Sequence, residues 1–325
     1  MGVTPAALRF PYGRVVLPRT RLAYIHLRNL LSDAKRDRAG RISGYVAVSL
    51  LDELVIFYLL RGEVANATVR SSGGAQPIAI ASALEKIPQE PEYGEICFHE
   101  ADEQQLACMF ETHVGAPEPW PDSMAAQDPA SLFPFLMSTT FDGMLEIVAN
   151  ENVNYLLFRN GAVARTFLTS GPHGTVVDRV AKLFSREGRV GELKVTRWTL
   201  PQPLPVQAPP ALVHAYRELS AALVQRLVHE GRDDAPTVAE HARRNLIGAH
   251  PVLAGFSLSG APTHDPVTDA PALTSGVAAW IRELLWNGLD HDRTPPETLF
   301  RELTWERRHL FQSAGLFDQM PWKVV

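Results

Sequence analysis

Apolar and polar positions follow two different periods along this chain. Up to residue 200, short runs rich in β-branched and aromatic residues are bounded by glycine, as at residues 54–59 and 153–158, which predicts antiparallel strands. From residue 211 onward, apolar residues recur every three or four positions, which predicts amphipathic helices. We therefore expect an α+β protein in which small modules of helix and antiparallel sheet precede an all-α carboxy-terminal domain.

The strand pattern occurs twice in the same order. Two pairs of glycines share an offset of 99 residues, and a third matched segment has an offset of 97. The matched positions are Gly44 with Gly143, Gly62 with Gly161, and residues 93–98 with 190–195. A shortening by two residues in the second helix or its turns accounts for the change in offset. Because three ordered matches are hard to obtain by chance, we predict two tandem copies of one module.

Each copy is predicted to run helix, strand, strand, strand, helix, strand. The first helix is expected at residues 22–35 in one copy and at 130–138 in the other. Gly62 and Gly161 each follow a polar residue at the end of a strand, so we expect them in hairpin turns that demand a positive φ. The other matched glycines are expected to open strands. These structural roles explain the glycines without a bound phosphate.

Changes in composition mark the expected domain boundaries. Residues 115–128 are rich in Pro, Asp, Ser and Gln, and five prolines between 201 and 210 exclude a central strand or a helix there. The first copy ends in an additional helix at 100–114. The predicted organisation is a first module at 1–114, a linker at 115–128, a second module at 129–200, a proline-rich linker at 201–210 and a helical domain at 211–325.

Helices are expected throughout the last third of the chain, around a loop at 256–272. Their predicted positions are 211–231, 237–249, 277–285 and 296–314. Gly231 is placed to end the first of them, and Thr274 or Ser275 to cap the third. The tail at 317–322 is apolar for a chain end, so we expect it to pack back on the helices. The alternative is an exposed docking peptide that includes Trp322.

The charge of the chain is unevenly distributed. The net charge of −5 argues against a general nucleic-acid binder. Residues 1–41 nevertheless carry nine Lys or Arg against two Asp, so the remainder is strongly acidic. One interpretation is a solvated face of the first helix, and the other is a surface for an anion or an acidic protein partner. The candidate partner-binding residues are Arg19, Arg21, Arg28, Arg36, Arg38 and Trp322.

The sequence gives no indication of a membrane or secretory segment. Its longest apolar stretches are interrupted by charge within about ten residues, whereas a span needs about 20 apolar residues. The amino terminus has no apolar run, and Ala6 stands where a myristoylation pattern requires Ser or Thr. Cys97 and Cys108 both lie in apolar surroundings, which favours free buried thiols. We expect a cytoplasmic protein.

Motifs for catalysis, cofactors and metals are weak or missing in the sequence. No dinucleotide or phosphate-loop glycine motif is present. Residues 170–175 could present backbone amides to an anion, but a turn with Thr175 as helix cap explains them more simply. Residues 255–259 fail the nucleophile-elbow pattern. His264, Asp265, His291 and Asp292 lack the spacing of a metal site. We therefore predict no catalytic, cofactor-binding or metal-binding residue.

The first hairpin resembles a known family. Residues 57–67 read FYLLRGEVANA, an aromatic strand, a polar turn glycine and then Gly-x-Val-x-x-Ala. This segment resembles the PatA amino-terminal (PATAN) family of bacterial signalling modules, and the resemblance extends over roughly residues 20–200. In the second copy, Arg165 and Thr166 stand where the family alanine falls. The resemblance implies a non-catalytic module that binds a protein partner in signalling.

Three functional hypotheses follow. The first is a non-catalytic signalling scaffold that binds a protein partner, whose identity and stoichiometry the sequence does not give. The second is a sensor that binds a nucleotide-like second messenger between the two copies, with arginines holding its phosphates. The third is an enzyme whose site assembles from distant residues.

Overall fold

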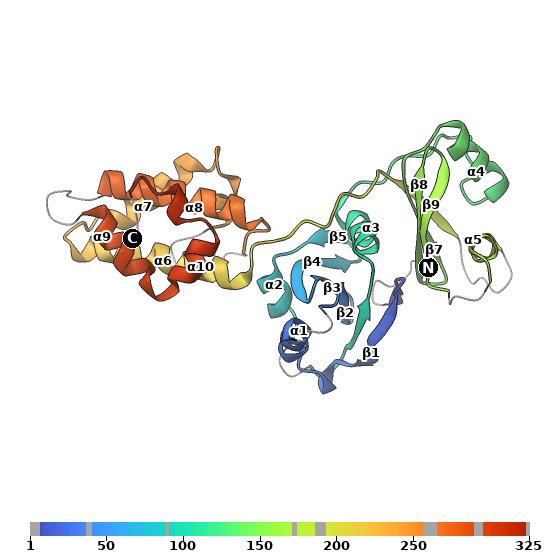
Figure 1. Ribbon diagram of the computed structural model, residues 1–325, viewed down its shortest axis with the longest axis horizontal. Coiled ribbons are helices and arrows are strands. Elements are labelled where there is room, and N and C mark those ends of the chain that lie inside the picture. Colours follow the sequence, from blue (N-terminus) through green and yellow to red (C-terminus); the bar gives the residue numbers. More distant parts are fainter. Residues whose placement is uncertain are drawn as a thin grey trace. The chain divides into compact units, whose positions relative to one another are not determined.

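The computed structural model describes residues 7–36, 41–88, 91–170, 174–185, 193–256, 265–288 and 295–322 (Figure 1). The chain divides into two compact units. The first contains Met1–Ile78 and Lys86–Pro205, and the second contains Ala79–Glu85 and Val206–Val325. The expectation of a mixed protein with helices and two antiparallel sheets is confirmed.

The larger sheet of the first unit has six strands in the order β1-β6-β2-β3-β4-β5. The strands are β1 Arg14–Arg21, β2 Gly44–Ser49, β3 Leu54–Leu60, β4 Glu63–Ser71, β5 Gly74–Pro77 and β6 Glu95–Glu100. Two helices accompany this sheet, α1 Leu27–Arg36 and α3 Glu103–Val114. Asp102 caps α3, because its side chain accepts a hydrogen bond from the Gln104 amide at 2.8 Å.

The smaller sheet has four strands in the order β10-β7-β8-β9. The strands are β7 Gly143–Ala149, β8 Asn152–Arg159, β9 Ala162–Phe167 and β10 Lys194–Trp198, and the helices are α4 Pro129–Ser138 and α5 Val176–Phe184. The N-terminus of α5 has the predicted cap. The Thr175 hydroxyl accepts from the Asp178 amide at 3.1 Å, and the Asp178 carboxylate accepts from the Thr175 amide at 3.2 Å.

The two sheets pair their strands in the same register. Gly44 lies opposite Leu59, and Gly143 lies opposite Phe158, so both members of the second pair are 99 residues further along the chain. The β-bulge of the first sheet falls between Tyr58 and Leu59, and that of the second between Leu157 and Phe158. Strand order β6-β2-β3-β4 also corresponds to β10-β7-β8-β9.

The last strand of each sheet corrects one detail of the sequence comparison. Gly44 pairs with Glu100 in the first sheet, and Met144 pairs with Trp198 in the second. These pairings place Glu95 and Lys194 at equivalent positions, again 99 residues apart. The predicted offset of 97 and the two-residue shortening are therefore wrong for the strand itself. The glycine match at position 191 that suggested them lies outside the described residues.

The predicted hairpin glycines adopt the expected conformation. Arg61 and Gly62 have φ of 53° and 81°, and Asn160 and Gly161 have φ of 49° and 76°. Two consecutive positive φ values match the twist of antiparallel strands. In each hairpin, a side chain just before the first strand of the sheet holds the turn by a hydrogen bond. In the first hairpin, Ser43 Oγ accepts from the Arg61 amide at 3.1 Å. In the second hairpin, Asp142 Oδ1 accepts from the Asn160 amide at 2.7 Å.

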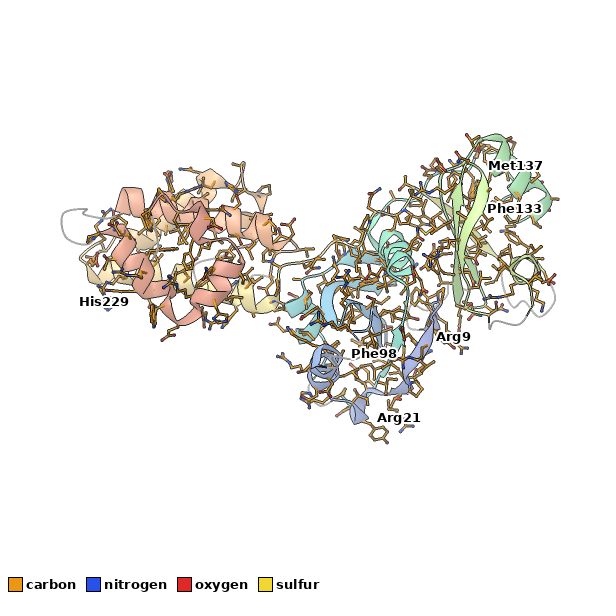
Figure 2. The ribbon with its side chains drawn as sticks, viewed as in Figure 1. Arg9, Arg21, Phe98, Phe133, Met137 and His229 are labelled. Carbon is orange, nitrogen blue, oxygen red and sulfur yellow. The ribbon has the colours of Figure 1, made fainter. Side chains whose placement is uncertain are left out.

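A helix end packs against each of these turns. A Cβ added at Gly62 would lie 2.5 Å from the carbonyl oxygen of Ala34, near the end of α1. A Cβ at Gly161 would lie 2.6 Å from the Cα of Met137, near the end of α4 (Figure 2). Only glycine therefore permits both the turn and the close helix.

The expected first helix at 22–35 is wrong over its first part. Residues 14–21 form the edge strand β1, a short 3-10 turn follows at Leu22–Tyr24, and α1 begins only at Leu27. The arginines of this region had suggested a polar helix face. Instead, Arg14, Arg19 and Arg21 lie on an edge strand, and Pro18 falls where its pairing with β6 is irregular, between Leu17 and Thr20.

The second unit contains a helical core. Its helices are α6 Pro210–His229, α7 Ala235–Leu246, α8 Ala270–Gly288, α9 Pro296–Thr304 and α10 Arg308–Ser313, with 3-10 turns at Pro251–Gly255, Trp305–Arg307 and Phe317–Gln319, and α2 Ile80–Glu85 groups with them. Trp280 is buried and donates from its indole nitrogen to the carbonyl of Ala239 at 2.9 Å. Gly231, with φ of 91°, follows α6 as predicted.

Two helix boundaries in this unit differ from the prediction. The helix α8 begins at Ala270, so Thr274 lies inside it rather than at its cap, and its hydroxyl accepts from the buried Tyr216 hydroxyl at 2.8 Å. The expected helix at 296–314 is interrupted by the turn at Trp305–Arg307. The tail packs back on the core, where the rings of Phe317 and Trp322 stand edge-on to Phe300.

Candidate functional site

A cavity of about 390 Å³ lies on one face of the six-stranded sheet. Alternation along the strands places Tyr45 and Ala47 of β2 on the same face as Cys97 and His99 of β6. The segment before β1 also contributes to the lining, including Tyr12. The cavity therefore depends on three stretches of chain that are distant in sequence.

Aromatic rings form one side of this cavity. The ring of Tyr12 stacks on His99 with 4.5 Å between centroids, and Tyr45 lies 5.4 Å from the same imidazole. The Tyr45 hydroxyl donates toward the carbonyl oxygens of Phe10 and Pro11, at 3.2 and 3.1 Å. These hydrogen bonds hold the amino-terminal segment against the sheet.

The remaining residues that line the cavity are mostly apolar, and the charged ones are Arg9, Arg19 and Glu95. The apolar contributors are Leu8, Val15, Pro18, Ala47, Leu54 and Ile96. Arg19 and Glu95 form an ion pair at its border, and Arg9 is exposed. Within the described ranges, Arg9 makes no ion pair, although its backbone pairs with Asn152 of the second sheet. A volume of about 390 Å³ fits a small ligand or a large apolar side chain.

Three titratable side chains of the cavity, Tyr45, Cys97 and His99, have pKa values shifted toward the neutral form. Burial raises the pKa of the Cys97 thiol to about 11 and lowers the pKa of His99 below its usual value. Burial also holds the pKa of the Tyr45 phenol well above 10. A protonated thiol is a weak nucleophile, because the thiolate is the reactive form. The lining therefore favours an apolar occupant over a reacting one.

A buried polar cluster lies where the two sheets face each other. The Tyr58 hydroxyl hydrogen-bonds with His113 Nδ1 at 2.8 Å and with the Thr68 hydroxyl at 3.2 Å. Burial, and secondarily Arg70, lowers the pKa of His113 to about 3, so this imidazole is neutral. Its neighbour Thr112 lies 3.5 Å from the Tyr155 hydroxyl of the second sheet. These contacts fix the pairing of the sheets in a common core.

Glu146 adds a carboxyl group to the same core. It is 4% exposed, and the Trp198 side chain is its hydrogen-bonding neighbour. Burial raises the pKa of this carboxyl, while Arg70 and Lys194 oppose the shift. No described cavity includes Glu146. We assign this carboxyl to the packing of the sheets.

The structure places the predicted partner-binding residues apart. Arg19 lines the cavity, whereas Arg21 is exposed at the end of β1, with Arg9 toward the other end (Figure 2). Arg28 is exposed on α1. The side chain of Arg36, like all of Arg38, lies outside the described residues. Trp322 belongs to the second unit and packs on its core.

Sequence reasoning missed the other cavity residues. Tyr12 and Arg9 precede the strand β1, which lies before the expected first helix at 22–35 and was not predicted. The spacing of Tyr45 and Ala47, and of Cys97 and His99, could have predicted that each pair lies on one face of its strand, because residues two apart share a face. Their pairing across β2 and β6 was needed to bring them together.

Among the described residues, no three His, Cys, Asp or Glu side chains are grouped to hold a metal ion. Three members of the considered metal set, His264, His291 and Asp292, lie outside the described residues, as do parts of segments 170–175 and 255–259. Among the helices described, none combines the length and apolarity needed to cross a membrane.

In comparisons with protein-family models, curated proteins and solved structures, nothing matches this chain.

Proposed function

We propose that this chain is a non-catalytic regulatory protein that acts by binding a protein partner. The observation that supports it is the apolar cavity with neutral aromatic walls, bordered by arginines on an exposed edge strand. Such a surface holds an apolar side chain by burial and discriminates among partners by charge.

We also propose that the two sheets are tandem copies of one module, followed by an all-α carboxy-terminal domain. Equal strand order, equal register and equivalent hairpin glycines support the duplication. The resemblance of residues 57–67 to PATAN modules supports a role in bacterial signalling, in the cytoplasm. Duplicated modules that bind partners need rigid turns and variable surfaces rather than shared catalytic groups.

The proposed partner presents an apolar residue flanked by acidic residues. Val15 and Val16 of β1 are 42% and 38% exposed, and Tyr12 is 47% exposed, so the strand offers apolar contact area beside the cavity. Arg9 and Arg21 are exposed and form no ion pair with any described residue. Acidic side chains of a partner would satisfy both guanidinium groups.

The test compares variants of the full chain against a partner isolated by affinity capture and then purified. Arg9→Glu combined with Arg21→Glu should weaken binding at least tenfold, and Ala47→Leu, which fills the cavity, should weaken it to a similar extent. Arg301→Glu is the matched control, because Arg301 is exposed on α9 in the second unit. Arg28→Glu tests whether the surface extends onto α1. Unchanged affinity in the double variant and in Ala47→Leu would refute the proposal.

The volume of the cavity favours one second candidate, a small-ligand sensor. About 390 Å³ is sufficient for a compact ligand with an aromatic ring. A ligand present at 100 times its dissociation constant stabilises a protein by about 2.7 kcal/mol. Thermal-shift screening with nucleotides and aromatic acids should then reveal stabilisation that Ala47→Leu removes. A protein partner without any such ligand supports the first function.

A further inference from the structure

A second cavity, of about 240 Å³, lies in the four-stranded sheet, between the β7–β8 turn and α5. Its lining contains Arg179 and Lys182, three asparagines and three hydroxyl side chains, and it contains no Asp or Glu. This lining is suited to bind an oxyanion, because it offers two cations and several hydrogen-bonding side chains and has no carboxylate to repel the ligand.

A buried asparagine organises the floor of this cavity. Asn154 is fully buried, and its Nδ2 donates to the Ile147 carbonyl at 3.3 Å. Its Oδ1 accepts from both the amide and the hydroxyl of Thr169, at 2.8 and 3.0 Å. The amide side chain therefore holds Thr169 at the cavity wall.

The fold itself does not require this polar floor. Asn154 lies opposite Ile147, and the position in the same register of the first sheet is Val55 opposite Val48. Val55 is fully buried. Burying an amide costs free energy unless its hydrogen bonds are made. The polar set thus belongs to the second sheet alone and calls for a role beyond packing.

The two cations come from one face of α5. Arg179 and Lys182 are three residues apart, which places them side by side on a helix. Arg179 donates from Nη2 to the Ser170 carbonyl at 2.8 Å, and its buried Nε has no partner. Asp178, which acts electrostatically on Lys182, is engaged by Thr175 in the helix cap.

We propose that this cavity binds a phosphate group, as inorganic phosphate or as a small phosphate monoester. Arg179 and Lys182 would neutralise the charge, and the unpartnered Nε of Arg179 would supply one donor. The volume, below that of a typical pocket for a drug-sized ligand, fits a phosphate with a small substituent rather than a whole nucleotide. This site is in the second sheet and is independent of the cavity on the first.

Calorimetric titration of the full chain with inorganic phosphate tests the proposal, at fixed ionic strength and pH 7.5. We expect binding at millimolar or lower concentration, weakened at least tenfold by Arg179→Met and by Lys182→Met. Lys182→Arg should retain most of the affinity. Arg159→Met is the matched control, because Arg159 is an exposed cation at the end of β8 in the same sheet.

Three outcomes would overturn the proposal. The first is no phosphate binding by the folded chain at ten millimolar, and the second is equal affinity in Arg179→Met, Lys182→Met and the parent. The third is equal affinity for acetate, which would indicate a general anion surface rather than a phosphate site. Circular dichroism of each variant ensures that lost binding is not lost folding. If Arg179→Met fails to fold, Lys182→Met with Lys182→Arg decides the question.

Discussion

At the scale of single residues, the buried groups of the first unit fall into two kinds. Apolar side chains such as Ile56 and Leu156 fill the sheet faces, as their sequence pattern predicts. Polar side chains such as Glu146, His113 and Asn154 are buried as well. Sequence alone identified none of these three as buried, because their burial depends on which faces of the two sheets meet.

Glu146 should make the stability of the first unit depend on pH. Its folded pKa is raised by burial, so the folded state favours the protonated form. The stabilising contribution of Glu146 to the free energy of unfolding is therefore fully present below the unfolded pKa of about 4.3. It is lost as pH rises through the raised pKa of the folded state. Glu146→Gln should stabilise the unit at pH 7 relative to the parent, and this advantage should shrink toward zero near pH 4. Denaturant unfolding at several pH values measures it, and a pH-independent difference would contradict the assignment.

His113 should produce the opposite dependence in acid. Its folded pKa is lowered to about 3, against about 6.5 unfolded, so stability is present above pH 6.5 and lost as pH falls toward 3. Full titration over this range would lower the free energy of unfolding by about 5 kcal/mol. His113→Gln should flatten the loss between pH 6 and pH 4. The control substitution is His229→Gln, at an exposed histidine of α6.

The hairpin glycines allow a residue-level test of the packed turns. Gly62→Ala meets both a φ of 81° and the Ala34 carbonyl, so it should destabilise the first unit by roughly 2–3 kcal/mol. Gly73→Ala, in the neighbouring hairpin, meets only a side-chain atom at 3.7 Å and should change stability by less than about 1 kcal/mol. Equal effects in denaturant unfolding would show that α1 does not press on the turn.

At the scale of elements, the sequence predicted the regular parts and missed the irregular ones. Strands such as β3 and β8 are dense in β-branched and aromatic residues, and their turns contain glycine, so local chemistry agrees with the fold. The strand β1 contains Pro18 and three arginines, and nearly all of its residues are exposed, so it lacks the apolar pattern of a buried strand. The cavity was hidden for the same reason, because β1 and the segment before it form its outer wall. Of the predicted partner-binding side chains that the structure describes, only Arg19 lines it.

The amino-terminal segment should loosen when its hydroxyl anchor is removed. Tyr45→Phe deletes the hydrogen bonds to Phe10 and Pro11 and leaves two buried carbonyls without this donor, at a cost of about 1–2 kcal/mol. The Val153 amide, which donates to the Arg9 carbonyl at 2.8 Å, should then exchange its hydrogen faster. Tyr93→Phe, at an exposed residue, is the control. Unaltered exchange at Val153 would show that the segment is held by packing alone.

At the scale of the whole molecule, the two compact units have separate hydrophobic cores. Leu156 belongs to a core cluster of the first unit, and Leu223 belongs to the helical core of the second. The chain passes from the first unit to the second more than once, because Ala79–Glu85 groups with the helices while the residues on both sides of it stay with the sheets. This connection does not follow from the sequence pattern, in which residues 78–87 read as the second helix of the first module.

Separate cores predict separate unfolding transitions. Leu156→Ala and Leu223→Ala each remove a fully buried side chain and should each cost about 2–5 kcal/mol within their own unit. In scanning calorimetry of the full chain, each substitution should lower the midpoint of one transition and leave the other in place. A single transition that both substitutions lower equally would show instead that the units unfold together.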